Sequence, residues 1–375
     1  MLNSLDIRNY RNLKELKINS LGRVNLVTGK NNTGKSTLLE AIAIYATGGD
    51  LRLIYQLLEE RGETFRQRNI NTNSTETNVK ILSSLFNNWD IAFDVSDAIS
   101  IGSIENTLFG EELSLVDCVS LRFVRYIDET QIDEQGNRAR KRRFLNNDFE
   151  LFDNYEIGLE VESKGGSYIL PLVDEKPYRF GVREFNKNNN VQLVRTRNIN
   201  KGINGSLFDN IALTNKEQYV IEALRIIEQL TERIAFIEES PRERSAVIKL
   251  LNSQQVLPLQ SMGDGINRVL TIILALVNSD NGYLLIDEFE NGLHYSVQEK
   301  LWEIIFQLSK RLNIQVFVTT HSNDCIKGFE NVLNKQDDLS AGKLIRLDNK
   351  NGVIKQIEFD ANELKIANSQ NIEIR

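Results

Sequence analysis

The sequence predicts an α/β fold with a parallel sheet, antiparallel strands near the N-terminus and an inserted, partly helical region. Two observations carry this prediction. A strand pattern at residues 24–27 leads through a glycine-rich loop into a helical pattern at residues 36–46. From about residue 264 to residue 319, helical and strand patterns alternate. Strands that alternate with helices form parallel sheets covered on both faces. We therefore expect both ends of the chain to build one domain.

The N-terminal part reads as strand, turn, strand, loop and helix. Residues 5–7 and 13–18 alternate apolar and polar side chains, which is typical of a half-buried hairpin. Residues 24–27 read as a short buried strand. Residues 36–46 have apolar positions at helical spacing, so a helix is expected directly after the loop.

The middle of the chain is less regular. The polar segment 69–78 is predicted to be an exposed loop. Alternating patterns at 122–126 and 155–173 predict antiparallel strands, with Gly165–Gly166 as a hairpin turn. Residues 215–238 read as one long amphipathic helix, either part of the core or an arm for a partner.

Regular helix and strand patterns resume near the C-terminus. Helices are predicted at about 264–278 and 296–312, and buried strands at 283–286 and 315–319. The expected organisation is a head made of residues 1–50 and 255–375, with residues 51–254 inserted as a lid containing β strands and a long helix.

Composition restricts the function classes. The net charge of -7 argues against a protein that coats nucleic acid, although a local basic patch could still bind it. Cys118 and Cys325 are isolated, so neither a disulfide framework nor a zinc site is expected. No secretion signal or membrane-length apolar stretch is present, and a cytoplasmic protein without a membrane partner is predicted.

The segment GKNNTGKST carries the clearest chemistry. Glycines at its first and sixth positions let backbone N–H groups point at phosphate oxygens, and the following helix contributes the positive end of its dipole. The lysine should reach the β- and γ-phosphates, and the serine hydroxyl should bind Mg²⁺. The predicted nucleotide-binding residues are Gly29, Asn31, Asn32, Thr33, Gly34, Lys35, Ser36 and Thr37.

An acidic pair follows the buried strand pattern at residues 283–286. Asp287 is expected to hold Mg²⁺ together with Ser36, and Glu288 to polarise the attacking water. Strand alternation is expected to send the two carboxylates in opposite directions. Alone such a pair is a weak signal, but the glycine loop makes it a strong one.

Two further segments are candidates. Ser261 and Gly263 precede an apolar helix, which fits a helix cap as well as a functional turn. His321 follows the strand pattern at 315–319 and is one of two histidines in the chain, so a contact with the γ-phosphate or the attacking water is predicted.

Together these segments resemble the ABC-type ATPases of the SMC, RecF and OLD group. The opening LDIRNYRNLKELKI is similar to the first hairpin of that group. The stretches SMGDGINR and IDEFENGLHYSVQ resemble its stand-alone bacterial branch of AAA-family ATP-binding proteins, members of which supply the ATPase half of anti-phage systems. The resemblance covers about residues 1–50 and 205–330.

The resemblance implies an ABC-type P-loop head that uses ATP and Mg²⁺. It places Ser261 and Gly263 opposite the γ-phosphate held by a second subunit, so an ATP-dependent homodimer or higher homo-oligomer is expected. It also implies control of an effector protein from a neighbouring gene, a nuclease or toxin, in anti-phage defence. The alternatives are a RecF- or SMC-like ATPase that binds DNA in repair, and an ATP-dependent scaffold with very slow turnover.

The sequence departs from the family pattern at three points. Met262 replaces the usual first signature glycine, and Asp264 stands where many relatives have Gln or Glu. No glutamine loop can be assigned; Gln131 is a candidate by position alone. The nuclease domain that follows the histidine in OLD nucleases has no counterpart here, so any nuclease activity is expected from a partner.

The basic run Arg138–Arg143 has two interpretations. It is either a solvated loop of the inserted region or a contact for nucleic-acid phosphates.

Overall fold

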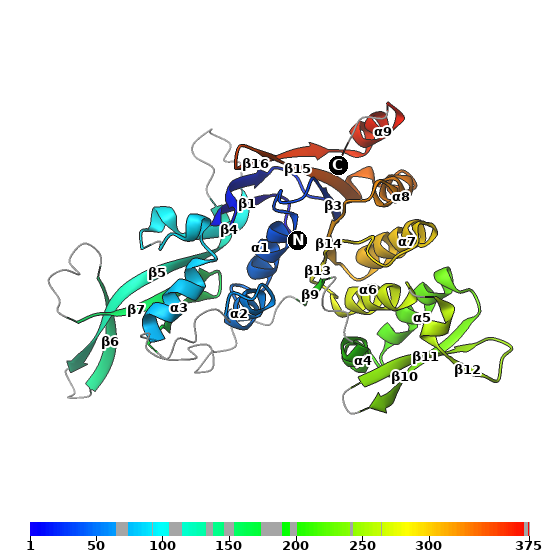
Figure 1. The fold of residues 1–375 in the computed structure, drawn as a ribbon, viewed down its shortest axis with the longest axis horizontal. Coiled ribbons are helices and arrows are strands. Elements are labelled where there is room, and N and C mark those ends of the chain that lie inside the picture. The colour runs from blue at the N-terminus through cyan, green and yellow to red at the C-terminus, as the bar shows by residue number, and fades with distance from the viewer. Residues whose placement is uncertain are drawn as a thin grey trace. The chain divides into compact units, whose positions relative to one another are not determined.

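The computed structural model describes residues 1–64, 74–91, 93–104, 115–132, 138–145, 154–173, 190–195, 201–240, 243–263, 265–370 and 374. The chain forms two compact units, both drawn in Figure 1. Unit 1 comprises Met1–Ser4, Ile18–Leu39 and Asn188–Arg375, and unit 2 comprises Leu5–Lys17 and Glu40–Lys187. Helix α1 (Lys35–Ala46) begins in unit 1 and ends in unit 2.

Unit 1 is built on a six-stranded sheet with the order β16-β15-β3-β14-β13-β9. Its strands are β3 (Val24–Thr28), β9 (Val191–Val194), β13 (Tyr283–Ile286), β14 (Gln315–Thr319), β15 (Gly342–Lys350) and β16 (Val353–Phe359). Five of these strands run parallel to one another, and the sixth, β16, is antiparallel to its neighbour β15. The predicted strands at 24–27, 283–286 and 315–319 are confirmed, and β3 lies at the centre between β15 and β14.

The helices of unit 1 bury an extended apolar core. They are α4 (Lys201–Asp209), α5 (Asn215–Ile227), α6 (Ile266–Asn278), α7 (Tyr295–Arg311), α8 (Asn323–Leu333) and α9 (Ala361–Ser369). In Figure 1, α6, α7 and α8 follow one face of the parallel sheet. Trp302 on α7 is fully buried and stacks on Phe289 with ring centroids 4.5 Å apart. The helices expected at 264–278 and 296–312 are thus confirmed within two residues.

A second sheet in unit 1 replaces part of an expected helix. The prediction of one helix over 215–238 is wrong beyond Ile227, because β10 (Thr231–Ser240) pairs with β11 (Glu243–Leu250), which pairs with β12 (Val256–Pro258). Along β10, Ile234 is buried and Phe236 is half-buried, whereas Arg233, Ala235 and Ile237 are exposed. This alternation is the burial pattern of a strand with one solvated face, and the segment forms no helical arm.

Unit 2 contains a seven-stranded sheet with the order β2-β1-β4-β5-β7-β8, to which β6 is added beside β5. Its strands are β1 (Leu5–Tyr10), β2 (Leu13–Ile18), β4 (Ile99–Ile104), β5 (Leu115–Ile132), β6 (Arg138–Leu145), β7 (Glu156–Ser163) and β8 (Gly166–Pro171). The pairs from β1–β4 to β7–β8 are antiparallel. The predicted N-terminal strands and the hairpin near Gly165–Gly166 are confirmed.

Unit 2 also contains the helices α2 (Leu51–Glu60) and α3 (Ser74–Ser83). The exposed loop expected at 69–78 is wrong from Ser74 onward, where α3 begins; residues 69–73 lie outside the described residues. Asn78 explains the difference, because its side chain is buried and its amide donates to the carbonyl of Leu172 over 3.0 Å. Polar composition alone had suggested solvent exposure.

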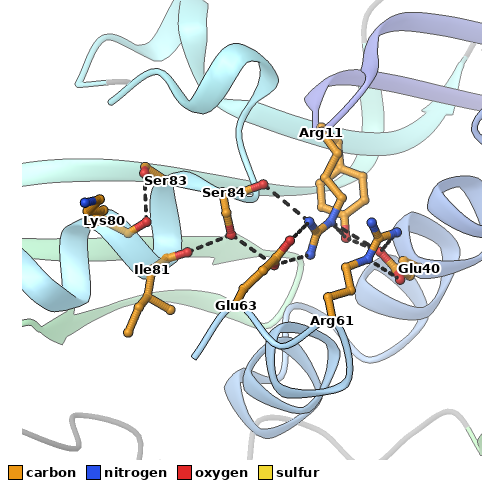
Figure 2. Close-up of polar contacts among 9 residues, drawn as sticks. Arg11, Glu40, Arg61, Glu63, Lys80, Ile81, Ser83 and Ser84 are labelled. Carbon is orange, nitrogen blue, oxygen red and sulfur yellow. Dashed lines mark hydrogen bonds and ion pairs between the residues drawn. The ribbon is translucent and has the colours of Figure 1, made fainter. Parts of the chain in front are cut away.

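A largely buried ion-pair network lies within unit 2 (Figure 2). Glu40 is 1% exposed and accepts contacts from Arg61 at 3.0 Å and from Arg11 at 3.3 Å. Arg11 also pairs with Glu63 at 2.9 Å. Burial, followed by the charge of Glu40, raises the pKa of Tyr10, whose hydroxyl contacts Glu40. The network joins the β1–β2 turn to α1 and the end of α2.

The two units divide the chain differently from the expected boundaries. Residues 188–254, expected in the insertion, belong to unit 1, because β9 pairs with β13 and α5 packs on α6 and α7. Residues 5–17, expected in the head, belong to unit 2, because β1 pairs with β4.

Candidate nucleotide and catalytic site

The glycine loop follows β3 directly and has a backbone that requires glycine. Gly29 has a φ of 137°, and a Cβ there would lie 2.3 Å from the carbonyl oxygen of Leu347. Gly34 has a φ of 88°, also in the left-handed region. Side chains at these positions would strain or block the backbone. The loop therefore brings peptide N–H groups to the N-terminus of α1, as a phosphate-binding loop requires.

Lys35 folds back onto this loop. Its ammonium donates to the carbonyl oxygens of Gly29 and Lys30, both at 2.8 Å. Burial lowers the pKa of Lys35 to about 8, although the charges of Asp287, Glu290 and Glu288 act in the opposite direction. The lysine is thus held beside the loop and faces three carboxylates.

The other predicted loop residues have distinct positions. Asn31 and Asn32 are exposed, and Asn32 has a φ of 62°. Thr33 is buried and donates to Lys30 over 2.9 Å, which closes the turn. Thr37 is buried in the first turn of α1.

Ser36 and Asp287 meet although they are far apart in the sequence. The Ser36 hydroxyl donates to Oδ1 of Asp287 over 3.1 Å. The Thr319 hydroxyl donates to the same oxygen over 2.6 Å. One loop and the ends of two neighbouring parallel strands therefore converge on a single carboxylate. Thr319 was not predicted, since one threonine in an apolar strand gives no local signal.

This donor set fits Mg²⁺. The ion prefers oxygen ligands and is commonly bound by one or two carboxylates together with substrate phosphates. Over the residues that the structure describes, no group of three or more His, Cys, Asp or Glu could hold a metal ion. Ser36 and Asp287 supply two oxygen atoms that could hold the ion, and nucleotide oxygens would complete its coordination.

Glu288 lies in a tight turn rather than on the strand. β13 ends at Ile286, and Glu288 has a φ of 52°. Its N–H donates to the Thr319 hydroxyl over 2.9 Å. Strand alternation therefore does not set the directions of Asp287 and Glu288, because both residues follow the end of β13 and Glu288 is in the left-handed region.

Arg268 is a site residue that the sequence did not reveal. It is 3% exposed and donates to the backbone carbonyls of Asp287 at 2.9 Å, Arg195 at 3.2 Å and Glu288 at 3.4 Å. The only available signal was a basic residue near the start of an otherwise apolar helix.

Glu290 anchors the segment that carries His321. One carboxylate oxygen accepts the Thr320 hydroxyl and the other accepts the His321 N–H, both at 2.7 Å. The His321 side chain is half-buried and follows β14, as predicted. Glu290 was missed because the interpretation of the acidic run stopped at Glu288.

The Ser261–Gly263 turn is exposed. Ser261 lies in the 3₁₀ turn Leu259–Met262, and its hydroxyl donates to the carbonyl of Pro258 over 2.7 Å. Gly263 has a φ of 113°, and a Cβ there would meet nothing within 4 Å. The N-cap of α6 is Gly265, without a side-chain cap. Ser261 is therefore not a helix cap; Asp264 lies outside the described residues.

The basic run 138–143 is a strand, not a loop. β6 pairs with β5 so that Arg142 faces Asp128, at 3.2 Å, and Arg143 contacts Glu129 at 3.5 Å. Both arginines thus have acidic partners on the neighbouring strand.

A strand–glycine loop–helix unit facing an acidic strand end in a parallel sheet is the arrangement of a P-loop ATPase. Residues 1–326 match the family model described as "AAA ATPase domain", so the chain belongs to this family and is an ATPase.

Known proteins show similarity over different lengths. A Helicobacter pylori protein named "ATP/GTP phosphatase" is 24% identical over 92% of each chain. The "DNA replication and repair protein RecF" of Nitrosococcus oceani is 42% identical over 13% of this chain and 14% of its own. The "SmcHead bound to the C-winged helix domain of ScpA" is 13% identical, covers 96% of this chain and 98% of its own, and has a TM-score of 0.49.

Within the described residues, none of the helices combines the length and apolar character needed to cross a bilayer.

Proposed function

We propose that the chain hydrolyses ATP with Mg²⁺ in a site that is completed by the Ser261–Gly263 turn of a second copy. In this proposal the P-loop residues 29–37 hold the triphosphate through backbone N–H groups and the helix dipole. Lys35 exchanges the carbonyls of Gly29 and Lys30 for β- and γ-phosphate oxygens. Mg²⁺, when bound, neutralises charge on those oxygens. Ser36 and Asp287 are its proposed protein ligands.

Glu288 and His321 are the proposed catalytic residues. Glu288 would accept a proton from the attacking water, and its backbone is already fixed by Thr319 and Arg268. His321 would contact the γ-phosphate, with its backbone held by Glu290. Preorganised groups of this kind act because they need not rearrange during the reaction.

The two-copy proposal rests on the exposure of the Ser261–Gly263 turn, called the signature turn below. Ser261 is exposed and bonds to its own backbone at Pro258, and Gly263 is exposed with open space around it. Among the described residues, the structure records no hydrogen bond between this turn and the P-loop. A turn that is exposed and preformed can meet the nucleotide of another molecule, which a symmetric dimer would allow at both sites.

Two variants test this proposal. Glu288→Gln should bind ATP, lose most hydrolysis and accumulate as an ATP-bound dimer or larger assembly, measured by light scattering and phosphate release. Adding Ser261→Arg should abolish the assembly but leave ATP binding intact. Ser206→Arg makes the same change at an exposed serine of α4 and serves as the control. An inactive Glu288→Gln that stays monomeric with ATP bound would contradict the two-copy site.

The name of one relative bears on which nucleoside triphosphates the site accepts. Because the Helicobacter pylori relative is named for both ATP and GTP, we propose that this site accepts either triphosphate. Competition of GTP with ATP in hydrolysis tests this: inhibition at comparable concentrations supports it, and absence of inhibition contradicts it.

The output proposed from the resemblance of the motifs is control of an effector protein in anti-phage defence. The second candidate is a DNA-binding ATPase, which the short RecF match favours. Co-purification of a neighbouring gene product supports the first. ATP-strengthened, salt-sensitive DNA binding supports the second. Stable assemblies with turnover near zero support a scaffold.

The ion pairs of β6 bear on the DNA candidate. Because Arg142 and Arg143 contact carboxylates, their positive charge is partly neutralised. They should therefore attract phosphates less strongly than the basic run alone suggested. Asp128→Asn with Glu129→Gln should release them. A steeper salt dependence of DNA binding in this double variant would place DNA on β6, and an unchanged dependence would exclude it.

A further inference from the structure

Arg268 places a charge in α6, the most apolar of the described helices. Along α6, the residues from Val269 to Val277 are all buried, and Arg268 itself is 3% exposed. Burial lowers the pKa of Arg268, while the charges of Asp287, Glu288 and Glu290 act in the opposite direction. A buried charge is unfavourable unless it makes compensating hydrogen bonds. The position therefore calls for a role beyond filling the core.

The guanidinium makes its bonds to backbone carbonyls at the ends of two neighbouring strands. Nη2 donates to Asp287 at 2.9 Å and to Glu288 at 3.4 Å, and Nη1 donates to Arg195 at 3.2 Å. β13 and β9 are parallel neighbours, so their carboxyl ends meet at this point. Nε is buried and makes no hydrogen bond to the described residues. The hydrogen bonds of the guanidinium therefore go to these carbonyls.

The turn held by Arg268 has an unusual backbone. Glu288 has a φ of 52°, which is unfavourable for a residue with a long side chain. Its N–H is held by the Thr319 hydroxyl, and its carbonyl by Arg268. A strained conformation persists only when the surrounding structure determines it from several sides. Arg268 and Thr319 provide that determination.

Arg268 also lies close to the signature turn along the chain. α6 begins at Ile266, directly after Gly265. A Cβ on Gly265 would lie 2.7 Å from the carbonyl oxygen of Gly292, so the start of α6 packs tightly on the loop that follows Glu288. The start of α6 thus contacts the Asp287–Glu288 turn through Arg268, and it approaches Gly292, further along the same loop, through Gly265.

We propose that Arg268 is a positioning residue that fixes the Asp287–Glu288 turn and links it to the Ser261–Gly263 turn. This inference rests on the proposed role of Glu288 in water activation. Arg268 does not touch nucleotide in this proposal; it sets where the Glu288 carboxylate points. Movement of the signature turn would reach the catalytic carboxylate through the first turn of α6.

The test separates positioning from folding. Arg268→Met keeps apolar volume but removes all three carbonyl contacts. It should bind ATP without Mg²⁺ within about threefold of the wild type, whereas turnover should fall about 10–100-fold, the range seen when supporting partners are lost. Arg268→Lys, which keeps the charge but carries its donors on one nitrogen instead of a planar fork, should be intermediate. Thr271→Val is the control, because Thr271 is buried one turn further along and bonds only within α6.

Chemical rescue gives a readout that a purely structural role would not produce. Arg268→Ala leaves a space shaped for guanidinium, so millimolar guanidinium should restore turnover at least several-fold, and methylammonium should not. Wild-type turnover in a folded Arg268→Met protein would overturn the proposal. An equal loss of Mg²⁺-free ATP binding and turnover, without rescue, would overturn it too.

A double variant distinguishes this inference from the role of Glu288. If Arg268 acts through Glu288, Arg268→Met should reduce turnover little further in a Glu288→Gln background. Additive losses would overturn the positioning role while leaving Glu288 as the base. Wild-type hydrolysis by Glu288→Gln alone would instead reject the base assignment.

Discussion

The Ser36 hydroxyl donates to the Asp287 carboxylate over 3.1 Å, and this contact joins the P-loop to the acidic strand end across the parallel sheet. Ser36 follows β3 by way of the P-loop, and Asp287 directly follows β13. The carboxyl ends of these two strands lie at the same edge of the parallel sheet. The Thr319 hydroxyl binds the same carboxylate oxygen and fixes its direction. The pair therefore presents two oxygen atoms at the place where nucleotide phosphates would enter.

Removing the Ser36 hydroxyl or the negative charge of Asp287 should weaken Mg²⁺ binding. For Ser36→Ala and Asp287→Asn we expect the Mg²⁺ concentration for half-maximal turnover to rise at least about tenfold, because the first loses a ligand and the second exchanges a carboxylate for a neutral amide. Nucleotide binding without Mg²⁺ should change little. Asp337→Asn, on an exposed residue, is the matched control. An unchanged Mg²⁺ requirement in both variants would reject the assigned ligands.

ATP affinity should depend on pH through Lys35. Burial lowers the pKa of the free lysine to about 8, and a bound triphosphate should raise it again. Binding is then accompanied by proton uptake above pH 8, so affinity should be constant below about pH 7 and fall as pH rises through 8, by up to about tenfold per pH unit.

Calorimetry in two buffers with different ionisation heats measures this proton uptake. Lys35→Met should bind more weakly and lose the pH dependence above 8. Equal affinity of the wild type at pH 7 and pH 9.5 would mean that Lys35 stays charged in the free protein.

Glu40 should be important for the stability of unit 2. Glu40→Ala leaves the buried Arg11 and the half-buried Arg61 without this partner, although Arg11 keeps Glu63. We expect a loss of roughly 3 kcal/mol, since removing one member of a buried ion pair strands the other charge. Urea unfolding compared with Glu59→Ala, an exposed position on α2, checks this. Equal midpoints would show that the network contributes no net stability.

The parts of the site that were predictable are those fixed by local backbone chemistry. Gly29 and Gly34 need left-handed φ angles, and Lys35 and Ser36 must follow them at the start of a helix, so the spacing alone identifies the loop. The acidic pair was predictable because a short, continuously apolar strand precedes it.

The unpredicted site residues act through long-range contacts. Thr319, Arg268 and Glu290 bind atoms that are distant in sequence or belong to the backbone, so their neighbours in sequence give no pattern. The prediction of one long helix over residues 215–238 was wrong for another reason. Leu230 and Ile234 continue the helical spacing of α5, yet Ile234 also fits the period of two that β10 follows. Pairing with β11 decides between them, and that partner lies beyond the segment itself.

The central claim, that each active site takes its Ser261–Gly263 turn from a second copy, is tested most directly by mixing two inactive variants. Lys35→Ala should not bind ATP but keeps its signature turn, and Ser261→Arg should bind ATP but cannot complete a partner's site. In mixed dimers the first copy completes the site of the second. An equimolar mixture should then recover up to about a quarter of wild-type turnover, because half of the dimers are mixed and each has one intact site. A mixture as inactive as its two components, with mixed dimers demonstrated, would contradict the claim.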